Sequence, residues 1–296
     1  MKILVTNNTL GGLGGSETYA YTLIKELHGR DDIEVHAFSP QIGLIGSKLK
    51  NIGVNVVNKP DSSYDLILAS HTSTIPYIKS IKGFKVQTCH GVYPALEQPY
   101  GGLDGYVSIS NEVYNHLKNK RIDSTIIHNG IDCERFKITH PINKELKSVL
   151  SLSHSDLLNN MLRSVCVKHG VKLICLNKYT NPIFNVEDAI NEVDMVVTLG
   201  RGAYESMACG RNVMILDKRP YINKPPIGDG ILTELNIENS LKNNCSGRFS
   251  NRVFGEKEIE EEIIKYDYTL GEFNREYALK NLNIKMQVDK YLNLKK

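Results

Sequence analysis

One short stretch of the sequence, GRGAYESMACGRNV at residues 200–213, combines glycines, a fixed cation and a carboxylate. Gly202 lets the chain enter a helix closely, and we expect Glu205 in the first turn of that helix, where the helix dipole stabilises a negative charge. A carboxylate there can accept two hydrogen bonds from a diol such as that of ribose. Arg201 is a neighbouring cation suited to a diphosphate. The structural alternative is a glutamate that only caps its helix and an arginine that is solvated.

A second stretch, LGGLGGSE at residues 10–17, follows an apolar strand and precedes a helix for which Ser16 is the expected N-cap. Gly14 and Gly15 allow a sharp turn and a close approach to a ligand, and free N–H groups at the helix start suit a phosphate or a sugar hydroxyl. A dinucleotide fingerprint fits poorly, because Glu17 replaces its third glycine and no acid ends the second strand. A tight turn without a ligand is the structural alternative.

Two histidines stand at the ends of apolar strands, where functional residues of parallel sheets gather. His90 precedes Gly91, and His71 follows another strand. A lone histidine is more often structural, so position alone favours a site only weakly. Glu17 could join them from the first helix, although a first-turn acid is its simpler role. Cys89 adjoins His90, but no Asp or Asn partner is evident, and we do not expect thiol chemistry.

The elements that position these residues alternate strand and helix, which predicts an α/β fold with parallel sheets and helices on both faces. The pattern lapses near residues 136–145, which carry a proline and mixed charges, and then restarts. We therefore expect two doubly wound domains, at residues 1–140 and 141–270. Within the second, residues 218–256 read as loop-rich. Residues 271–296 are expected to form a last helix that returns to the first domain.

Composition agrees with a globular protein of one large or two ordinary domains: 296 residues, 41% hydrophobic and 23% charged. The net charge of +3 does not indicate a nucleic-acid binder. The six cysteines form no CxxC pair and match no zinc pattern, which suggests the reducing cytoplasm. We expect no signal peptide and no membrane span.

Five ordered segments resemble family 4 glycosyltransferases of the GT-B fold. ESMACGRNV is similar to that family's E-A-M-A-x-G-x-P-V segment, with Asn212 at the usual proline. The other four segments are the glycine-rich loop with its helix, Thr88–Gly91, Val107–Ser110, and Ile127–Asp132 followed by Arg135 and Phe136. The order and spacing of these matches, across residues 1–213, carry the resemblance.

The resemblance implies two Rossmann-like domains facing across a cleft and transfer from a nucleotide sugar, which is the donor substrate. It implies retention of configuration, no metal and no other cofactor. Glu205 would bind the donor ribose, Gly14 and Gly15 would lie against the diphosphate or the transferred sugar, and His90 would stand at the reaction centre. Gly202, Tyr204 and Ser206 belong to the same donor segment, while Glu17 and His71 are acceptor-side candidates.

Two departures from the family pattern concern the donor site. Val197 occupies the position of the family's first glutamate, and the loop at residues 151–156 lacks its Arg and Lys. Arg201, Arg248 or His154 could supply the missing positive charge.

Neither the sugar, the nucleobase, the acceptor nor the oligomeric state follows from the sequence. The acceptor could be a glycan, a lipid or, as in viral GT-B enzymes, a modified base in DNA. A DNA acceptor would need a basic rim, for which the candidates are Lys79, Lys82, Lys85, Lys118, Lys120 and Arg121. A non-catalytic nucleotide-sugar-binding protein and a sugar-nucleotide epimerase are further alternatives.

Overall fold

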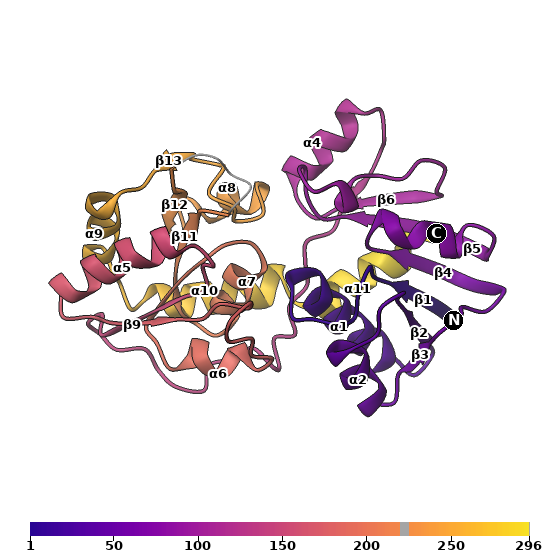
Figure 1. The fold of residues 1–296 in the computed structure, drawn as a ribbon, viewed down its shortest axis with the longest axis horizontal. Coiled ribbons are helices and arrows are strands. Elements are labelled where there is room, and N and C mark those ends of the chain that lie inside the picture. The colour runs from indigo at the N-terminus through magenta and orange to yellow at the C-terminus, as the bar shows by residue number, and fades with distance from the viewer. Residues whose placement is uncertain (220–224, 296) are drawn as a thin grey trace. The chain divides into compact units, whose positions relative to one another are not determined.

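The computed structural model describes residues 1–219 and 225–295 and divides into two compact units (Figure 1). The first unit comprises Met1–Gly130 together with Ile284–Lys296, and the second comprises Ile131–Asn283. Within the described residues, none of the helices is long and apolar enough to cross a membrane.

The first unit alternates strands and helices from its first residues, as its sequence pattern predicts. Its elements are β1 (Lys2–Thr6), α1 (Gly15–His28), β2 (Glu34–Phe38), α2 (Leu44–Asn51), β3 (Asn55–Val57), β4 (Ser63–Ala69), η1 (Thr72–Thr74), α3 (Ile75–Ile78), β5 (Lys82–Cys89), η2 (Ala95–Glu97), β6 (Gly105–Ser108), α4 (Asn111–Asn119), β7 (Thr125–Ile126), α11 (Ile284–Leu292) and η3 (Asn293–Lys295).

The strands of the first unit form one sheet in the order β3-β2-β1-β4-β5-β6-β7, and every pairing is parallel. The register aligns Thr6 with Ala69 and Ala69 with Gln87, so the carboxyl ends of β1, β4 and β5 share one edge. Successive strand residues face opposite sides of a sheet. Leu4 accordingly packs with Ile75 and Ile78 around α3 on one face.

The second unit repeats the alternation. Its elements are β8 (Ser148–Ser151), α5 (Asp156–Lys168), β9 (Lys172–Cys175), α6 (Val186–Asn191), β10 (Met195–Thr198), α7 (Arg201–Ala208), β11 (Asn212–Asp217), β12 (Ile227–Ile231), α8 (Ile237–Lys242), β13 (Arg252–Val253), α9 (Glu256–Ile264) and α10 (Leu270–Asn281).

Its sheet has the order β13-β12-β11-β10-β8-β9, in which β9, β8, β10 and β11 are parallel and β12 and β13 are antiparallel. The stretch expected to be loop-rich, residues 218–256, contains these two antiparallel strands and α8, while its residues 220–224 lie outside the described part of the chain. The glycines of β12 mask its strand pattern, since glycine weakens a strand signal. Gly228 is needed there, because a Cβ would lie 2.2 Å from the Ile215 carbonyl oxygen of the paired strand.

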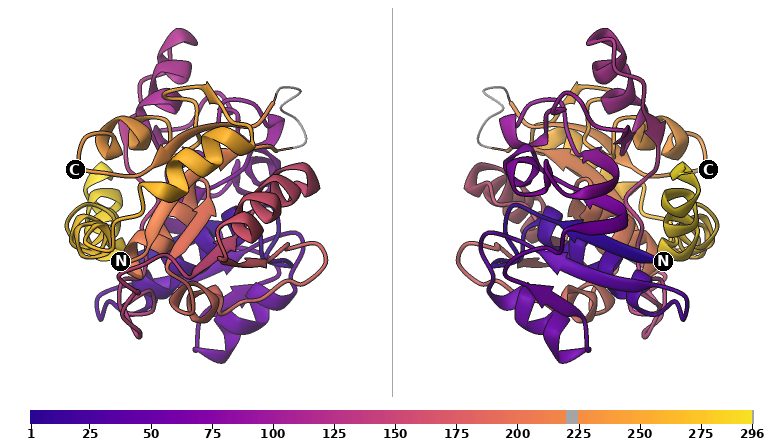
Figure 2. Two further views of the ribbon diagram at one scale, coloured as in Figure 1. Left: turned by 90° about the vertical axis from the view of Figure 1, so that its left-hand side faces the viewer. Right: turned by 90° about the vertical axis from the view of Figure 1, so that its right-hand side faces the viewer.

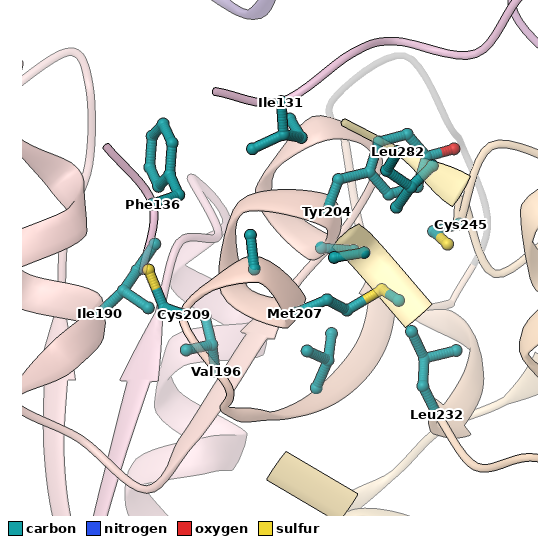
Figure 3. Packing of buried hydrophobic residues seen from close by; sticks show 14 of the residues in the cluster. Ile131, Phe136, Ile190, Val196, Tyr204, Met207, Cys209, Leu232, Cys245 and Leu282 are labelled. Atoms are coloured by element: carbon teal, nitrogen blue, oxygen red, sulfur yellow. The ribbon is translucent and has the colours of Figure 1, made fainter. Parts of the chain in front are cut away.

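Both faces of the second sheet are covered. Met195 and Val197 of β10 pack in a cluster with residues of α5 and α9, whereas Val196 faces α6, α7 and α10. In the left-hand view of Figure 2, α5 and α9 lie across the near face of these strands. Figure 3 shows the opposite cluster, in which Tyr204 of α7 lies beside Leu282 and Cys209 lies beside Ile190.

The structure places the change of unit at Gly130/Ile131 rather than at residue 140. Residues 131–136 belong to the second unit because their apolar side chains enter its core, where Phe136 is 2% exposed (Figure 3). The Ile131 N–H also donates to the Leu282 carbonyl at 2.8 Å.

The expected single last helix is two helices. α10 packs on α7 within the second unit, and only α11 belongs to the first. The break falls at Asn283, whose backbone bridges to Ile131 instead of continuing the helix. Gly130 allows the close approach, since a Cβ there would lie 2.8 Å from the Ile284 Cα.

Candidate functional site

The candidate residues gather at a switch point in each sheet, where successive connections leave in opposite directions. In the first unit this point lies between β1 and β4, and in the second between β8 and β10. Open parallel sheets bind ligands outside the carboxyl ends of the strands at such points. The glycine-rich loop, His71 and His90 follow β1, β4 and β5, while His154 and Arg201 follow β8 and β10.

Helix α7 begins immediately after β10, and its first residues are shaped by glycines. Gly200 caps the helix with φ 57° and ψ −129°, a conformation that favours glycine. Gly202 lies against β10, because a Cβ there would be 2.3 Å from Thr198 Oγ1. These two glycines bring the helix start up to the strand end, as the sequence predicts for Gly202.

Arg201 and Glu205 pair on this helix. Arg201 Nε donates to Glu205 Oε1 at 2.8 Å, and the two side chains are 7% and 10% exposed. The expectation that Glu205 lies in the first turn is wrong: α7 starts at Arg201, so Glu205 is its fifth residue. Its charge is therefore compensated by an arginine one turn earlier rather than by the helix end.

The charge on Glu205 is set by opposing effects. Burial raises the pKa of Glu205, and the positive charges of Arg201 and Arg135 oppose that rise. Arg135 itself donates to both carboxylate oxygens of Glu187, each at 2.8 Å. The sequence offers no signal for this second pair, because its members are 52 residues apart.

The other residues of the donor segment are held within the second unit. Tyr204 is fully buried, and its hydroxyl donates to Asn244 Oδ1 at 3.0 Å. The Ser206 hydroxyl donates to the Gly202 carbonyl at 2.7 Å. Both side chains therefore fix the helix start and its neighbouring loop.

His154 lies in the loop after β8, with its ring edge-on to Tyr179 at 5.2 Å between centroids. Burial lowers the pKa of His154, and the positive charge of Lys178 lowers it further. An imidazole with a lowered pKa is neutral near pH 7 and supplies little positive charge.

Arg248 lies by the carboxyl end of β11. Its Nη1 is 3.9 Å from Asp217 Oδ2, and Arg219 donates to the same carboxylate through Nε at 3.0 Å. Asp217 is fully buried. Two arginines thus share one carboxylate at this edge, a cluster that the sequence analysis missed although Asp217 ends an apolar strand.

In the first unit, α1 begins at Gly15 with Gly14 as its N-cap. The expectation that Ser16 caps the helix is wrong, because its hydroxyl donates to Glu17 Oε2 at 2.8 Å instead. Glu17 folds back over the turn: a Cβ on Gly14 would lie 2.3 Å from Glu17 Oε2. A Cβ placed on Gly15 would have no atom within 4 Å, so a ligand has room to approach the backbone there.

The structure brings His71, His90 and Glu17 into one neighbourhood. The two imidazole centroids are 5.9 Å apart, and His71 Nδ1 accepts from the Asn8 N–H at 3.3 Å. Burial lowers the pKa of His71, and the negative charge of Glu17 partly offsets this lowering. Tyr19 of α1 packs edge-on against His90, with 4.7 Å between ring centroids.

Cys89 is fully buried, and burial raises its pKa to about 12. A thiol with so high a pKa is not a nucleophile near neutral pH. No group of three or more His, Cys, Asp or Glu side chains arranged to hold a metal occurs within residues 1–219 and 225–295.

The basic residues suggested for a DNA rim do not all lie near His90. Lys82 starts β5 and His90 follows its last residue, so an eight-residue strand separates them. At about 3.3 Å per residue this is about 26 Å. Lys79 and Lys85 lie towards the same amino end of the strand.

No protein-family model and no curated protein sequence matches this chain. Its structure is similar to that of Anabaena HepE in complex with UDP and glucose, with a TM-score of 0.67 at 15% identity over 99% of this chain and 100% of that one. A glycosyltransferase from Rickettsia africae ESF-5 aligns with a TM-score of 0.61 at 14% identity, over 99% and 97% of the two chains.

A third solved structure is an α-glucosyltransferase in complex with UDP and a 13-mer DNA containing an HMU base. It aligns with a TM-score of 0.56 at 12% identity, over 100% of this chain and 99% of that one. At such identities the likeness establishes architecture rather than activity. The chain has two Rossmann-like α/β domains of the GT-B fold.

Proposed function

We propose that this protein is a glycosyltransferase that moves a sugar from a nucleoside diphosphate sugar to a hydroxyl acceptor. The observation that supports this most directly is the buried Arg201–Glu205 pair on α7, the helix that follows β10 at the switch point of the second sheet. The presence of UDP in two of the similar structures supports a nucleotide-linked donor.

In the donor half, Glu205 would accept hydrogen bonds from the ribose hydroxyls, since an ionised carboxylate accepts with both oxygens. Arg201 favours the charged form of this buried carboxylate, because its positive charge opposes the effect of burial on the pKa of Glu205. The resemblance of residues 205–213 to family 4 enzymes supports the same role, together with retention of configuration and no bound metal.

The leaving diphosphate needs a positive charge, and Arg248 is the residue we propose for it. Arg201 is committed to Glu205 at 2.8 Å, and His154 has a lowered pKa. Arg248 Nη1 lies 3.9 Å from the Asp217 carboxylate to which Arg219 also binds, so two guanidinium groups stand at the carboxyl end of β11. Electrostatic stabilisation of the departing group is commonly the largest catalytic contribution.

The first unit carries the candidate residues for the transferred sugar and for the acceptor. Gly15 leaves open space at the N-terminus of α1 for the diphosphate or the transferred sugar, although the Glu17 carboxylate covers the neighbouring Gly14. His90 would stand at the reaction centre, with His71 and Glu17 on the acceptor side, because these three side chains lie in one neighbourhood.

The acceptor could be a glycan, a lipid or a modified base in DNA. The similar α-glucosyltransferase bound to DNA favours the last of these. The separation of Lys82 from His90 along β5 weighs against it. A DNA acceptor would give binding that weakens steeply with salt, which a mobility-shift titration measures.

The test is release of nucleoside diphosphate from a panel of UDP-, GDP-, ADP- and dTDP-sugars, with Glu205→Gln compared with the wild type. Gln is chosen over Ala because deletion of the carboxylate leaves Arg201 buried without its partner. A lost hydrogen bond to a charged group predicts a KM for the donor raised about 10- to 100-fold.

The matched control is Glu262→Gln. Glu262 is a buried glutamate of the same unit that accepts from Arg252 at 2.9 Å, and it also accepts from Ile231 at the far end of β12. We expect its KM to equal that of the wild type. A wild-type protein that binds and cleaves none of the donors, or a Glu205→Gln variant that behaves like the control, contradicts the proposal.

A further inference from the structure

The ring of His90 is supported by a tyrosine from another element. Tyr19 of α1 is 2% exposed and meets the His90 imidazole edge-on, at 4.7 Å between centroids and 75° between ring planes. Neighbouring aromatic rings favour this edge-to-face geometry. The orientation of His90 therefore depends on where the Tyr19 ring is held.

Tyr19 is held in turn by the C-terminal helix. The hydroxyls of Tyr19 and Tyr291 share a hydrogen bond of 2.7 Å, and the Tyr291 hydroxyl shares a second one of 2.9 Å with Thr88 Oγ1. Thr88 precedes His90 by two residues on β5. One hydroxyl from α11 thus ties together the helix that supports His90 and the strand that carries it.

The hydroxyls of Tyr291 and Thr88 are buried and therefore depend on each other for hydrogen bonds. Tyr291 is 1% exposed and Thr88 is 2% exposed, so water cannot readily replace a missing partner. Burial also raises the pKa of Tyr291 well above its ordinary value, which keeps the phenol protonated and able to donate.

We propose that Tyr291 is a positioning residue for His90, acting through Tyr19 and Thr88. The proposal rests on the proposed function for its catalytic consequence, while the geometric part concerns the orientation of the His90 ring alone. It also assigns a role to α11 beyond packing: this helix completes the surroundings of a residue that lies about 200 positions earlier.

The variant that tests this is Tyr291→Phe, which keeps the ring and removes the shared hydroxyl. Tyr19 and Thr88 each lose a buried partner, so the Tyr19 ring and the end of β5 are free to shift. We expect kcat to fall about tenfold with the KM for the donor nearly unchanged, because misplacement of a reacting group slows chemistry more than binding. Tyr19→Phe should give a similar loss.

The chain offers a close control in Tyr64→Phe. Tyr64 is 5% exposed, its hydroxyl lies 3.0 Å from His36 Nδ1, and its ring meets His36 edge-on at 5.5 Å. It lies near the amino end of β4, away from the edge that carries His90. We expect a comparable drop in melting temperature for Tyr64→Phe, with kcat unchanged.

Histidine ring NMR separates the two outcomes without an activity assay. We expect Tyr291→Phe to move the His90 ring resonances and leave those of His36 in place, and Tyr64→Phe to do the reverse. His90→Gln assigns the signals. A Tyr291→Phe protein with the stability loss of the control but unchanged His90 resonances and kcat overturns the proposal. A wild-type protein that turns over no donor overturns the proposed function, while the NMR comparison still decides the positioning.

Discussion

Glu205 illustrates how a residue's chemistry depends on its neighbours. Its side chain is 10% exposed, and burial alone favours the neutral form of the carboxyl group. Arg201 at 2.8 Å opposes this effect and favours the ionised form, which accepts hydrogen bonds from a ribose diol. The arginine that the sequence suggests for a diphosphate is thus paired with its neighbouring carboxylate.

The pKa of His71 offers a direct test of whether Glu17 lies beside it in the first unit. Burial lowers its pKa, and Glu17 opposes that effect, so Glu17→Gln removes the opposing charge. We expect the pKa of His71 to fall further in this variant, as measured by NMR titration of its ring protons. Glu34→Gln, at the amino end of β2, should leave the His71 titration unchanged. A rise, or no change, in Glu17→Gln contradicts the placement of Glu17 near His71.

Residue types and strand ends in the sequence were sufficient to propose Glu205, His71 and His90 as candidates. Their pairings were not predictable, because Arg201–Glu205 and Tyr19–His90 depend on which helix faces point inward. The hydrogen bond between the hydroxyls of Tyr19 and Tyr291 joins residues 272 positions apart, so no local sequence pattern predicts it.

Among the elements, β10 is fixed at its amino end by one carboxylate. Asp194 accepts from the N–H groups of Asn143, Lys147 and Ser148, at 2.9 to 3.0 Å. Burial raises the pKa of Asp194, but these hydrogen bonds outweigh it, so the pKa lies below its ordinary value. The segment leading into β8 is thereby tied to the start of β10.

A lowered carboxyl pKa contributes stability above the unfolded pKa of 3.8 and loses it as pH falls through the folded value. We expect Asp194→Asn to reduce the free energy of unfolding by about 2–4 kcal/mol near neutral pH, because the amide cannot accept all these bonds. Urea denaturation at several pH values should show the difference from wild type shrinking towards about pH 3. Asp123→Asn, an exposed carboxylate, should change little. A loss that is constant with pH contradicts the assignment.

Strong patterns predicted the parallel strands and most helices, because buried strands read as continuous apolar runs. β12 escaped prediction because its sequence, IGDGI, contains two glycines. The break between α10 and α11 was not predicted either, because no proline or glycine stands at it in the sequence. It is a tertiary feature, made by the bridge between Asn283 and Ile131.

At the scale of the whole molecule, the chain passes between its two units twice, at Gly130/Ile131 and at Asn283/Ile284. The two passages lie together, since Ile131 bonds to the backbone of Leu282 and Gly130 packs on Ile284. We expect residues 271–296 to return to the first domain, and in the structure only Ile284–Lys296, which includes α11, belongs to the first unit. Each unit presents its candidate residues at its own switch point.

The most direct test of the account is a crystal structure of the protein with the donor that the turnover panel identifies. We predict that the ribose hydroxyls of this donor donate to Glu205 at about 2.6–3.0 Å, at the head of α7, with the diphosphate near Arg248. A nucleotide bound away from the carboxyl edge of the second sheet, with Glu205 still enclosed and out of reach, would contradict the central claim.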